Sequence, residues 1–317
     1  MPVDNPSSTL LYGGPGVGKT ATALSSFYDW KNKTLIGDGK LITFGRENNA
    51  ALALPDECRQ TPGGGSLRFS SPTLDSLGWL DRFEAAANGL LVAAKKGVHL
   101  DALVVDGMSE FDLLFEAAFK GDKWDKWDEL LNRAFAVMTR LDPEALGCDV
   151  FLTARVMEKK KSKSGGRTTM AGDPDFLNFD YYPSMRGSFR LHLPHYFNLV
   201  LYMETEQRRV TQGPLKGRML PAHVLNMVRT GEFYVKNQWE YDWIRAGLPL
   251  QLLNPDWVQV KDMLNGLATL DTTKENYVVP DSEDFATDPN LDIEVESAVG
   301  TSDSAACNGT ACRDYTI

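Results

Sequence analysis

Gly13-Gly14-Pro15-Gly16-Val17-Gly18-Lys19-Thr20 is the stretch that decides the fold. It matches the phosphate-loop pattern G-x-x-x-x-G-K-S/T at every fixed position. An apolar run, Leu10-Leu11-Tyr12, precedes it as a predicted strand, and a helix-compatible run over residues 21–30 follows it. Glycines allow backbone N–H groups to turn inward around an anion, and the following helix directs its positive end at the same anion. The pattern in this strand–loop–helix setting predicts a nucleotide phosphate site.

Each part of this loop has an expected role. Lys19 is expected to reach the β- and γ-phosphates and to take part in catalysis, and the Thr20 hydroxyl is expected to ligate Mg²⁺. The residues expected to hold ATP are Gly13, Gly14, Pro15, Gly16, Val17, Gly18, Lys19, Thr20 and Ala21.

A second informative stretch is the apolar run over residues 102–105, which ends in Asp106. An apolar strand that ends in aspartate is the Walker B pattern, which is weak alone and strong when a complete phosphate loop lies upstream. We expect the Asp106 carboxylate to hold Mg²⁺ through its water shell, beside Thr20. Ser109 or Glu110 could contribute to the same shell, and helix capping explains both residues equally well.

Glu47 is the candidate catalytic carboxylate. The run over residues 41–44 predicts a buried strand, and Gly45-Arg46-Glu47 follows it. Ligands of open α/β sheets lie beyond the carboxyl ends of the strands. Glu47 is therefore placed where a carboxylate could activate the water that attacks the γ-phosphate. A solvated loop acid, or an acid at a helix start, is the alternative.

A basic stretch follows the next predicted strand. That strand covers residues 148–153 and runs into Ala154-Arg155, which places Thr153 and Arg155 where a sensor of the γ-phosphate would lie. We expect the loop over residues 156–175 to grip a nucleic-acid backbone, with a solvated loop as the alternative. The predicted DNA-binding residues are Lys159, Lys160, Lys161, Lys163 and Arg167.

Charge is distributed unevenly along the chain. The net charge is −10, but residues 271–317 hold eleven acidic and two basic residues, which leaves 31 basic and 32 acidic residues elsewhere. The rest of the chain is nearly neutral, so nucleic-acid binding is compatible with the composition. Because residues 271–317 are polar, acidic and poor in aromatics, we expect a disordered tail there.

Cysteine spacing and hydropathy bear on the cellular location of the protein. The scattered cysteines Cys58, Cys148, Cys307 and Cys312 indicate reduced thiols in a cytosol, and the last two are only a weak suggestion of a metal site. No apolar run approaches the ~20 residues of a membrane span, and the start of the chain has no signal-peptide character. We therefore expect a cytoplasmic protein with no membrane partner.

The remaining patterns complete the predicted fold. We expect helices over residues 73–97, 109–140 and 254–267, a surface loop over 55–71, and strands over 198–203, 224–229 and 233–236. The predicted class is α/β, with a mostly parallel central sheet flanked by helices and closed by antiparallel strands. The predicted domains are a core over 1–250, a C-terminal helix over 251–270 and the acidic tail over 271–317.

This order of elements resembles the RecA-type ATPase core. It looks most like the phage-encoded RecA-like single-strand annealing ATPases, which consist of little more than that core. The resemblance covers roughly residues 8–240 and implies ATP hydrolysis with Mg²⁺. It implies that Glu47 is the catalytic glutamate and that Asp106 is the aspartate associated with Mg²⁺. In Tyr234-Val235-Lys236-Asn237, it implies that Lys236 acts in the ATP site of the neighbouring subunit, like an arginine finger.

The same resemblance implies the partners. These are single-stranded DNA, further copies of the chain in a filament or ring, and, as further candidates, a single-strand binding protein or other replication and recombination proteins. The location would be the host cytoplasm if a phage encodes the chain.

Two other functions stay open at this point. A P-loop kinase or small-molecule NTPase needs an acceptor pocket and usually an arginine-containing lid, which Arg167, Arg186 and Arg190 could supply. A non-hydrolysing scaffold would use ATP only to order subunits.

Overall fold

The computed structural model describes residues 6–45, 49–69, 78–118, 123–158, 179–184, 193–210, 214–229 and 232–268. The chain divides into the units Met1–Pro280 and Asp281–Ile317, and every described residue belongs to the first unit. The predicted acidic tail over 271–317 therefore lies outside the described residues.

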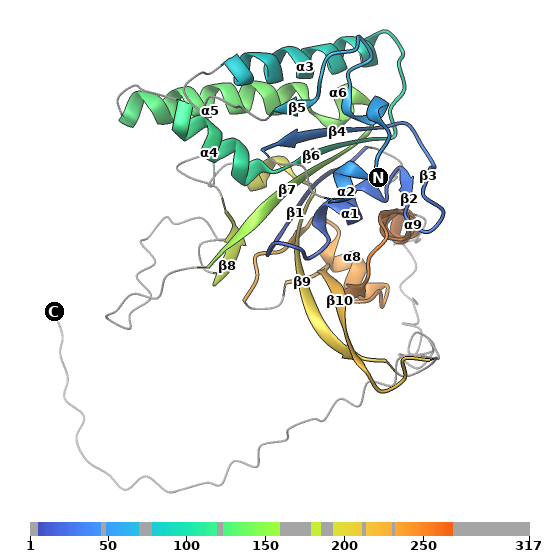
Figure 1. Cartoon of the computed structure of the whole chain (residues 1–317). Helices are drawn as coiled ribbons and strands as arrows, with labels where there is room; N and C mark the ends of the chain where they lie inside the picture. Colours follow the sequence, from blue (N-terminus) through green and yellow to red (C-terminus); the bar gives the residue numbers. More distant parts are fainter. Residues whose placement is uncertain are drawn as a thin grey trace, which may run out of the picture. The chain divides into compact units, whose positions relative to one another are not determined.

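The described elements alternate between strands and helices (Figure 1). The strands are β1 (Ser8–Gly13), β2 (Tyr28–Asp29), β3 (Thr34–Leu35), β4 (Gly39–Phe44), β5 (Arg68–Phe69), β6 (Ala102–Asp106), β7 (Asp149–Glu158), β8 (Tyr181–Pro183), β9 (Leu199–Arg209), β10 (Met219–Asn226), β11 (Lys236–Asn237) and β12 (Gln251–Leu253). The α-helices are α1 (Lys19–Leu24), α2 (Asn49–Leu52), α3 (Gly78–Lys95), α4 (Met108–Ala118), α5 (Lys123–Arg140), α6 (Pro143–Leu146), α8 (Glu240–Arg245) and α9 (Trp257–Ala268). Short 3₁₀ helices cover Asp56–Arg59 and Leu193–Tyr196.

The central sheet has the strand order β12-β10-β9-β1-β7-β6-β4-β5. The strands from β9 to β5 in this order run parallel, whereas β10 is antiparallel to β9 and β12 is antiparallel to β10. β8 and β11 add antiparallel pairs to β7 and β9. The predicted α/β class, with a mostly parallel sheet and some antiparallel strands, is confirmed.

This strand order decides where a ligand can bind. From β1 the chain passes over the positions of β7 and β6 to reach β4, and it then returns through β6 and β7. Next it crosses to β9, on the other side of β1. The carboxyl ends of β1, β7, β6 and β4 therefore lie side by side, next to the point where the connections change direction. In sheets of this kind the ligand crevice forms at such a point.

Helices cover both faces of the sheet. In Figure 1, α3, α5 and α6 lie on one side of it, and α1 and α9 lie on the other. On the first side Phe44 meets Trp79, Phe83 and Phe111 edge to face, with ring centroids 5.0–6.0 Å apart. On the second side Trp257 of α9 meets the edge of the Phe151 ring at 4.7 Å. These fully buried aromatic contacts fix the helices against the strands that carry the site.

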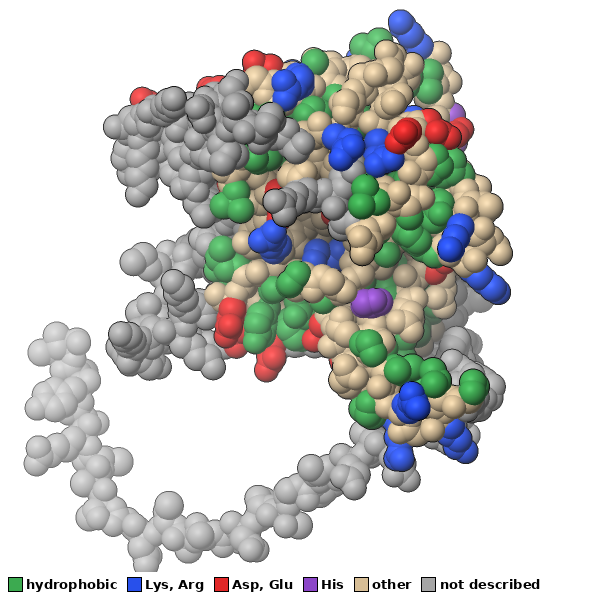
Figure 2. Space-filling model, in the orientation of Figure 1, with side chains coloured by type: hydrophobic (Ala, Val, Ile, Leu, Met, Phe, Trp, Pro, Cys, Tyr) green, Lys and Arg blue, Asp and Glu red, His purple; other side chains and the backbone are tan. Residues whose placement is uncertain are grey.

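β9 and β10 form a hairpin whose outer half is more exposed than the rest of the sheet. Burial along β9 is continuous over its first five residues and then alternates, and β10 begins with three exposed residues. Figure 2 shows Lys and Arg side chains gathered at this outer end. The basic residues of the outer end are Arg208, Arg209, Lys216 and Arg218.

The first helix is shorter than predicted. The sequence predicts a helix over residues 21–30, but α1 ends at Leu24. The hydroxyls of Ser25 and Ser26 donate to the carbonyls of Thr22 and Ala23, at 2.6 and 2.7 Å. These side chains take up carbonyls at the helix end, which is a general way for serine to compete with helix continuation.

Several other predicted boundaries are wrong. The helix predicted over 109–140 is two helices, α4 and α5, and the loop predicted over 55–71 contains a 3₁₀ helix and the edge strand β5. The strand predicted over 224–229 is β10, which begins at Met219, because its exposed first half pairs with β9. Of the strand predicted over 233–236, Phe233 makes one isolated bridge and only Lys236 is in β11. β7 continues to Glu158 because Val156–Glu158 pair with β8, so the basic segment begins later than residue 156.

Within the described part of the chain, none of the helices combines the length and the hydrophobicity that a membrane crossing requires.

Candidate functional site

A cavity of about 490 Å³ opens at the carboxyl edge of the parallel strands. Its lining comes from the loop after β1, the start of α1, the ends of β4 and β6, the middle of β7, and the first turns of α2 and α4. The polar and charged side chains in this lining are Lys19, Thr20, Asn49, Asp106, Glu110, Thr153 and Arg155. The predicted phosphate loop and the predicted Asp106 therefore belong to one cavity.

Two glycines of the loop, Gly13 and Gly18, lie close against neighbouring strands. A Cβ on Gly13 would lie 2.1 Å from the Met203 carbonyl oxygen, and one on Gly18 would lie 3.2 Å from the His223 ring. Gly16 and Gly18 also have positive φ angles of 76° and 91°, which favour glycine. The loop is thus held closely against β9 and β10, with a backbone path that only glycine can follow.

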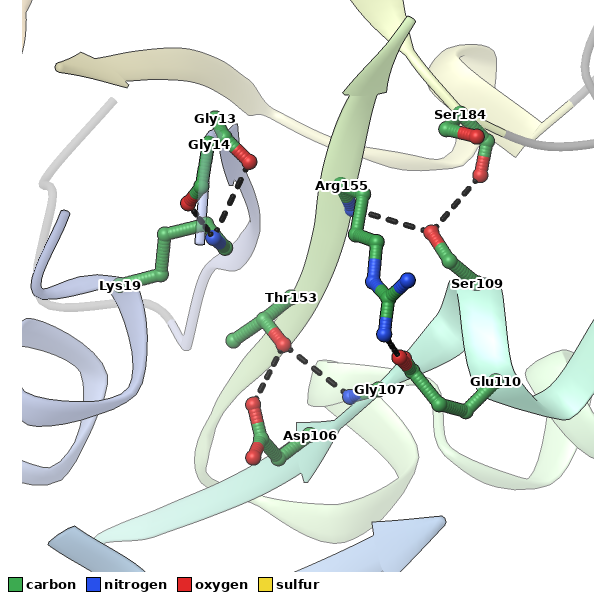
Figure 3. Close-up of polar contacts among 10 residues, drawn as sticks. All are labelled: Gly13, Gly14, Lys19, Asp106, Gly107, Ser109, Glu110, Thr153, Arg155 and Ser184. Atoms are coloured by element: carbon green, nitrogen blue, oxygen red, sulfur yellow. Dashed lines mark hydrogen bonds and ion pairs between the residues drawn. The ribbon is translucent and has the colours of Figure 1, made fainter. Parts of the chain in front are cut away.

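Lys19 bends back over this loop. Its Nζ donates to the carbonyl oxygens of Gly13 and Gly14, at 3.1 and 2.6 Å (Figure 3). Burial lowers the pKa of Lys19 to about 8, while the nearby carboxylates of Asp106 and Glu110 oppose that shift. A buried ammonium beside a glycine loop is suited to a phosphate, because an anion would favour the charged form.

Two threonine hydroxyls converge on Asp106. Thr20 Oγ1 donates to Asp106 Oδ1 at 2.8 Å, and Thr153 Oγ1 donates to the same oxygen at 2.6 Å. Thr153 Oγ1 also accepts a hydrogen bond from the Gly107 N–H at 3.1 Å (Figure 3). This arrangement is possible because β7 pairs with β6, so that Thr153 lies beside the carboxyl end of β6.

These oxygens fit a magnesium ion that a nucleotide helps to hold. Among the described residues, no group of three or more His, Cys, Asp and Glu side chains could hold a metal ion. Mg²⁺, however, is commonly bound through one or two protein oxygens, with phosphates and waters as its other ligands. Thr20 Oγ1 and Asp106 Oδ1 supply two hard oxygens of that kind, 2.8 Å apart, at the head of the phosphate loop.

An ion pair joins the middle of β7 to the start of α4. The Arg155 guanidinium pairs with the Glu110 carboxylate (Figure 3). Ser109 Oγ accepts from the Arg155 N–H and donates to the Ser184 carbonyl, both at 2.9 Å. Ser109 therefore ties β7 and the segment after β8 to α4, which is a structural role that differs from its suggested place in a magnesium shell.

Several predicted site residues are not among the described residues of the cavity. Glu47 lies outside the described residues, between Gly45 and Asn49, and so do all five predicted DNA-binding residues over 159–167. Lys236 pairs with Val200, at the amino-terminal end of β9, whereas Met203 of β9 pairs with Gly13. Its Nζ donates to the Pro194 and His195 carbonyls at 3.3 and 3.5 Å. Lys236 does not line the cavity of its own chain, and its action on a neighbouring subunit stays a prediction.

Glu110 is a cavity residue to which the sequence assigns no definite role. Glu110 was open between a metal shell and a helix cap, and the structure directs its carboxylate into the cavity, against Arg155. The available signal was its spacing: it lies four residues after Asp106, in the first turn of the helix that follows the Walker B strand.

No family model matches the chain, and a search of curated proteins finds no match either. The chemistry of the site therefore follows from its own residues.

Proposed function

We propose that this cavity binds ATP with Mg²⁺ and that the protein hydrolyses the ATP, as a RecA-like P-loop ATPase. One observation carries the proposal: Thr20 and Thr153 both donate to Asp106, beside a glycine loop that a lysine ammonium covers. In P-loop NTPases the loop and its lysine cradle the β- and γ-phosphates, while the loop Ser or Thr and a Walker B Asp hold Mg²⁺.

The residues of the chain divide the work as follows. The loop backbone binds the phosphates, and the Lys19 ammonium exchanges the Gly13 and Gly14 carbonyls for phosphate oxygens. Bound Mg²⁺ would neutralise phosphate charge beside Thr20 and Asp106. Thr153 holds the Asp106 carboxylate in one orientation, so that little reorganisation is needed when the nucleotide binds.

We further propose that the ATPase acts on single-stranded DNA as an oligomer. Support comes from the continuity of β7, which carries Thr153 and Arg155 in the cavity and runs on to Glu158. The basic segment over 159–167 begins at the next residue. A change at the nucleotide would thereby act directly on the strand that leads into the segment predicted to contact DNA.

The test is nucleotide binding and hydrolysis by the parent protein and by Lys19→Ala. We expect ATP affinity to fall at least about tenfold in the variant, because a charge-assisted hydrogen bond to phosphate is lost. Lys216→Ala, which removes an exposed lysine of the β9–β10 hairpin, is the matched control and is expected to bind ATP normally.

Hydrolysis with and without DNA separates the candidate functions. Stimulation by single-stranded DNA would support the proposal, and stimulation by a small acceptor alone would favour a kinase. Tight binding with no turnover under any condition would favour a scaffold. Unchanged ATP affinity in Lys19→Ala would contradict nucleotide binding at this loop.

A further inference from the structure

Glu110 lies in a space that is bounded by two glycines, which have no side chains to fill it. A Cβ on Gly45, at the end of β4, would lie 3.4 Å from Glu110 Cγ, and one on Gly107 would lie 3.2 Å from Glu110 Oε2. Both glycines have positive φ angles, of 74° and 96°. The carboxylate is therefore held between the ends of two strands, at the edge where the phosphate loop lies.

The function proposed above assigns no role to the Glu110 carboxylate. Among the described residues that line the cavity, the carboxylates are Asp106 and Glu110, and Asp106 already accepts from Thr20 and Thr153. Glu110 is close enough to Lys19 for its charge to act on the ammonium. This second carboxylate therefore lines the same cavity as Lys19 and Asp106, in which a bound nucleotide would lie.

Arg155 pairs with this carboxylate, but its own side chain is not held in place by burial. Its backbone N–H is bound by Ser109, but its side chain is 58% exposed, against 25% for Glu110. An ion pair so accessible to water is weak. A triphosphate carries more negative charge than one carboxylate and can accept two parallel hydrogen bonds from a guanidinium. The guanidinium can therefore leave Glu110 for a phosphate while β7 keeps its place.

We propose that Glu110 positions the attacking water and that Arg155 holds Glu110 in reserve until a γ-phosphate draws the guanidinium away. The inference rests on the proposed ATPase function and gives the role predicted for Glu47 to a different residue. In the step, the water oxygen forms a bond to the γ-phosphorus as the bond from that phosphorus to the β–γ bridging oxygen breaks. ADP leaves with the bridging oxygen, and the proton of the water moves to Glu110 and then to solvent.

The variant Glu110→Gln distinguishes a role of Glu110 in positioning the attacking water from a merely structural role. The amide fills the same space but neither accepts the proton nor holds the guanidinium by charge. We expect hydrolysis to fall at least about 100-fold. We expect ATP affinity, measured at equilibrium with and without Mg²⁺, to rise about two- to fivefold, because no ion pair has to be broken on binding.

Arg155→Gln tests the other half of the pair and does not depend on the first variant folding. We expect its affinity for ATP to fall about tenfold and its affinity for ADP to change less than twofold, since only ATP has the phosphate that draws the guanidinium. Equal losses for ATP and ADP would overturn the reserve role of Arg155. The thermal unfolding midpoint of each variant serves as the control for folding.

Two outcomes keep the inference distinct from the proposed function. If the parent protein binds no ATP, the proposed function itself fails. If Lys19→Ala loses ATP binding but Glu110→Gln hydrolyses ATP at the parent rate, the ATPase stands and the inference about Glu110 is overturned. Glu47→Gln measured in parallel shows which of the two carboxylates the reaction requires.

Discussion

The carboxyl edge of the sheet and the outer half of the β9–β10 hairpin both display charged side chains, but they hold them differently. At the sheet edge, Asp106 is fixed by hydroxyls from β7 and α1, and the loop backbone lies against β9. At the hairpin end, the apolar side chains of Leu215 and Met219 are 42% and 55% exposed, beside the basic residues. The two regions therefore differ less in their charge than in how far contacts from other strands fix their charged side chains.

The largest expected effect comes from adding a methyl group where the loop packs against β9. Gly13→Ala places a Cβ 2.1 Å from a backbone oxygen, which cannot move as a flexible side chain could. We expect the free energy of unfolding to fall by about 3 kcal/mol or more, and ATP binding to be lost. Urea denaturation and equilibrium ATP binding measure the two effects.

Gly63→Ala is the matched control for that variant, because a Cβ there would have no atom within 4 Å. We expect its stability and its ATP affinity to stay near those of the parent protein. A Gly13→Ala protein as stable as the Gly63→Ala protein would show that the loop is not pressed against β9.

A smaller and more selective effect is expected at the proposed magnesium site. Asp106→Asn keeps the size of the side chain but removes the negative charge that Thr20 and Thr153 surround. We expect ATP affinity in the presence of Mg²⁺ to fall at least about tenfold, because a carboxylate favours the hard cation. In EDTA the variant and the parent should differ by less than about twofold. A loss of equal size in EDTA would instead assign Asp106 a purely structural role.

How much of this site the sequence predicts depends on how local each signal is. The common position of the predicted phosphate loop and Asp106 at one cavity could be predicted, because each is a continuous pattern that includes the strand before it. The Arg155–Glu110 pair joins residues 45 positions apart, and the contact of Gly18 with His223 depends on where β10 lies in the sheet. No pattern within one segment contains that information.

The wrong boundaries have a related cause. The first residues of β10, Met219-Leu220-Pro221-Ala222, are apolar without alternation, and the proline argues against a strand, so the sequence gives no strand signal there. The α1 helix ends early because of two serine hydroxyls, in a run whose composition is compatible with a longer helix. Hydrophobic periodicity in a sequence indicates which residues are buried. It gives no information where strand pairing or a side-chain hydrogen bond decides the structure.

The smallest expected effects concern DNA, and they compare two basic regions directly. One variant replaces Lys159, Lys160, Lys161 and Lys163 by Gln, and the other replaces Lys216 and Arg218 of the hairpin by Gln. If the first region grips single-stranded DNA, the slope of log affinity against log salt should flatten by about 0.7 for each lysine that contacts a phosphate. The hairpin variant should keep the parent slope, since its charges are exposed but have no proposed connection to the nucleotide cavity. Salt titrations of single-stranded DNA binding measure both slopes.

A flattened slope in the hairpin variant alone would assign the proposed DNA surface to β9 and β10. It would also remove the proposed link between ATP and DNA through β7, because that strand ends at the first region and not at the second.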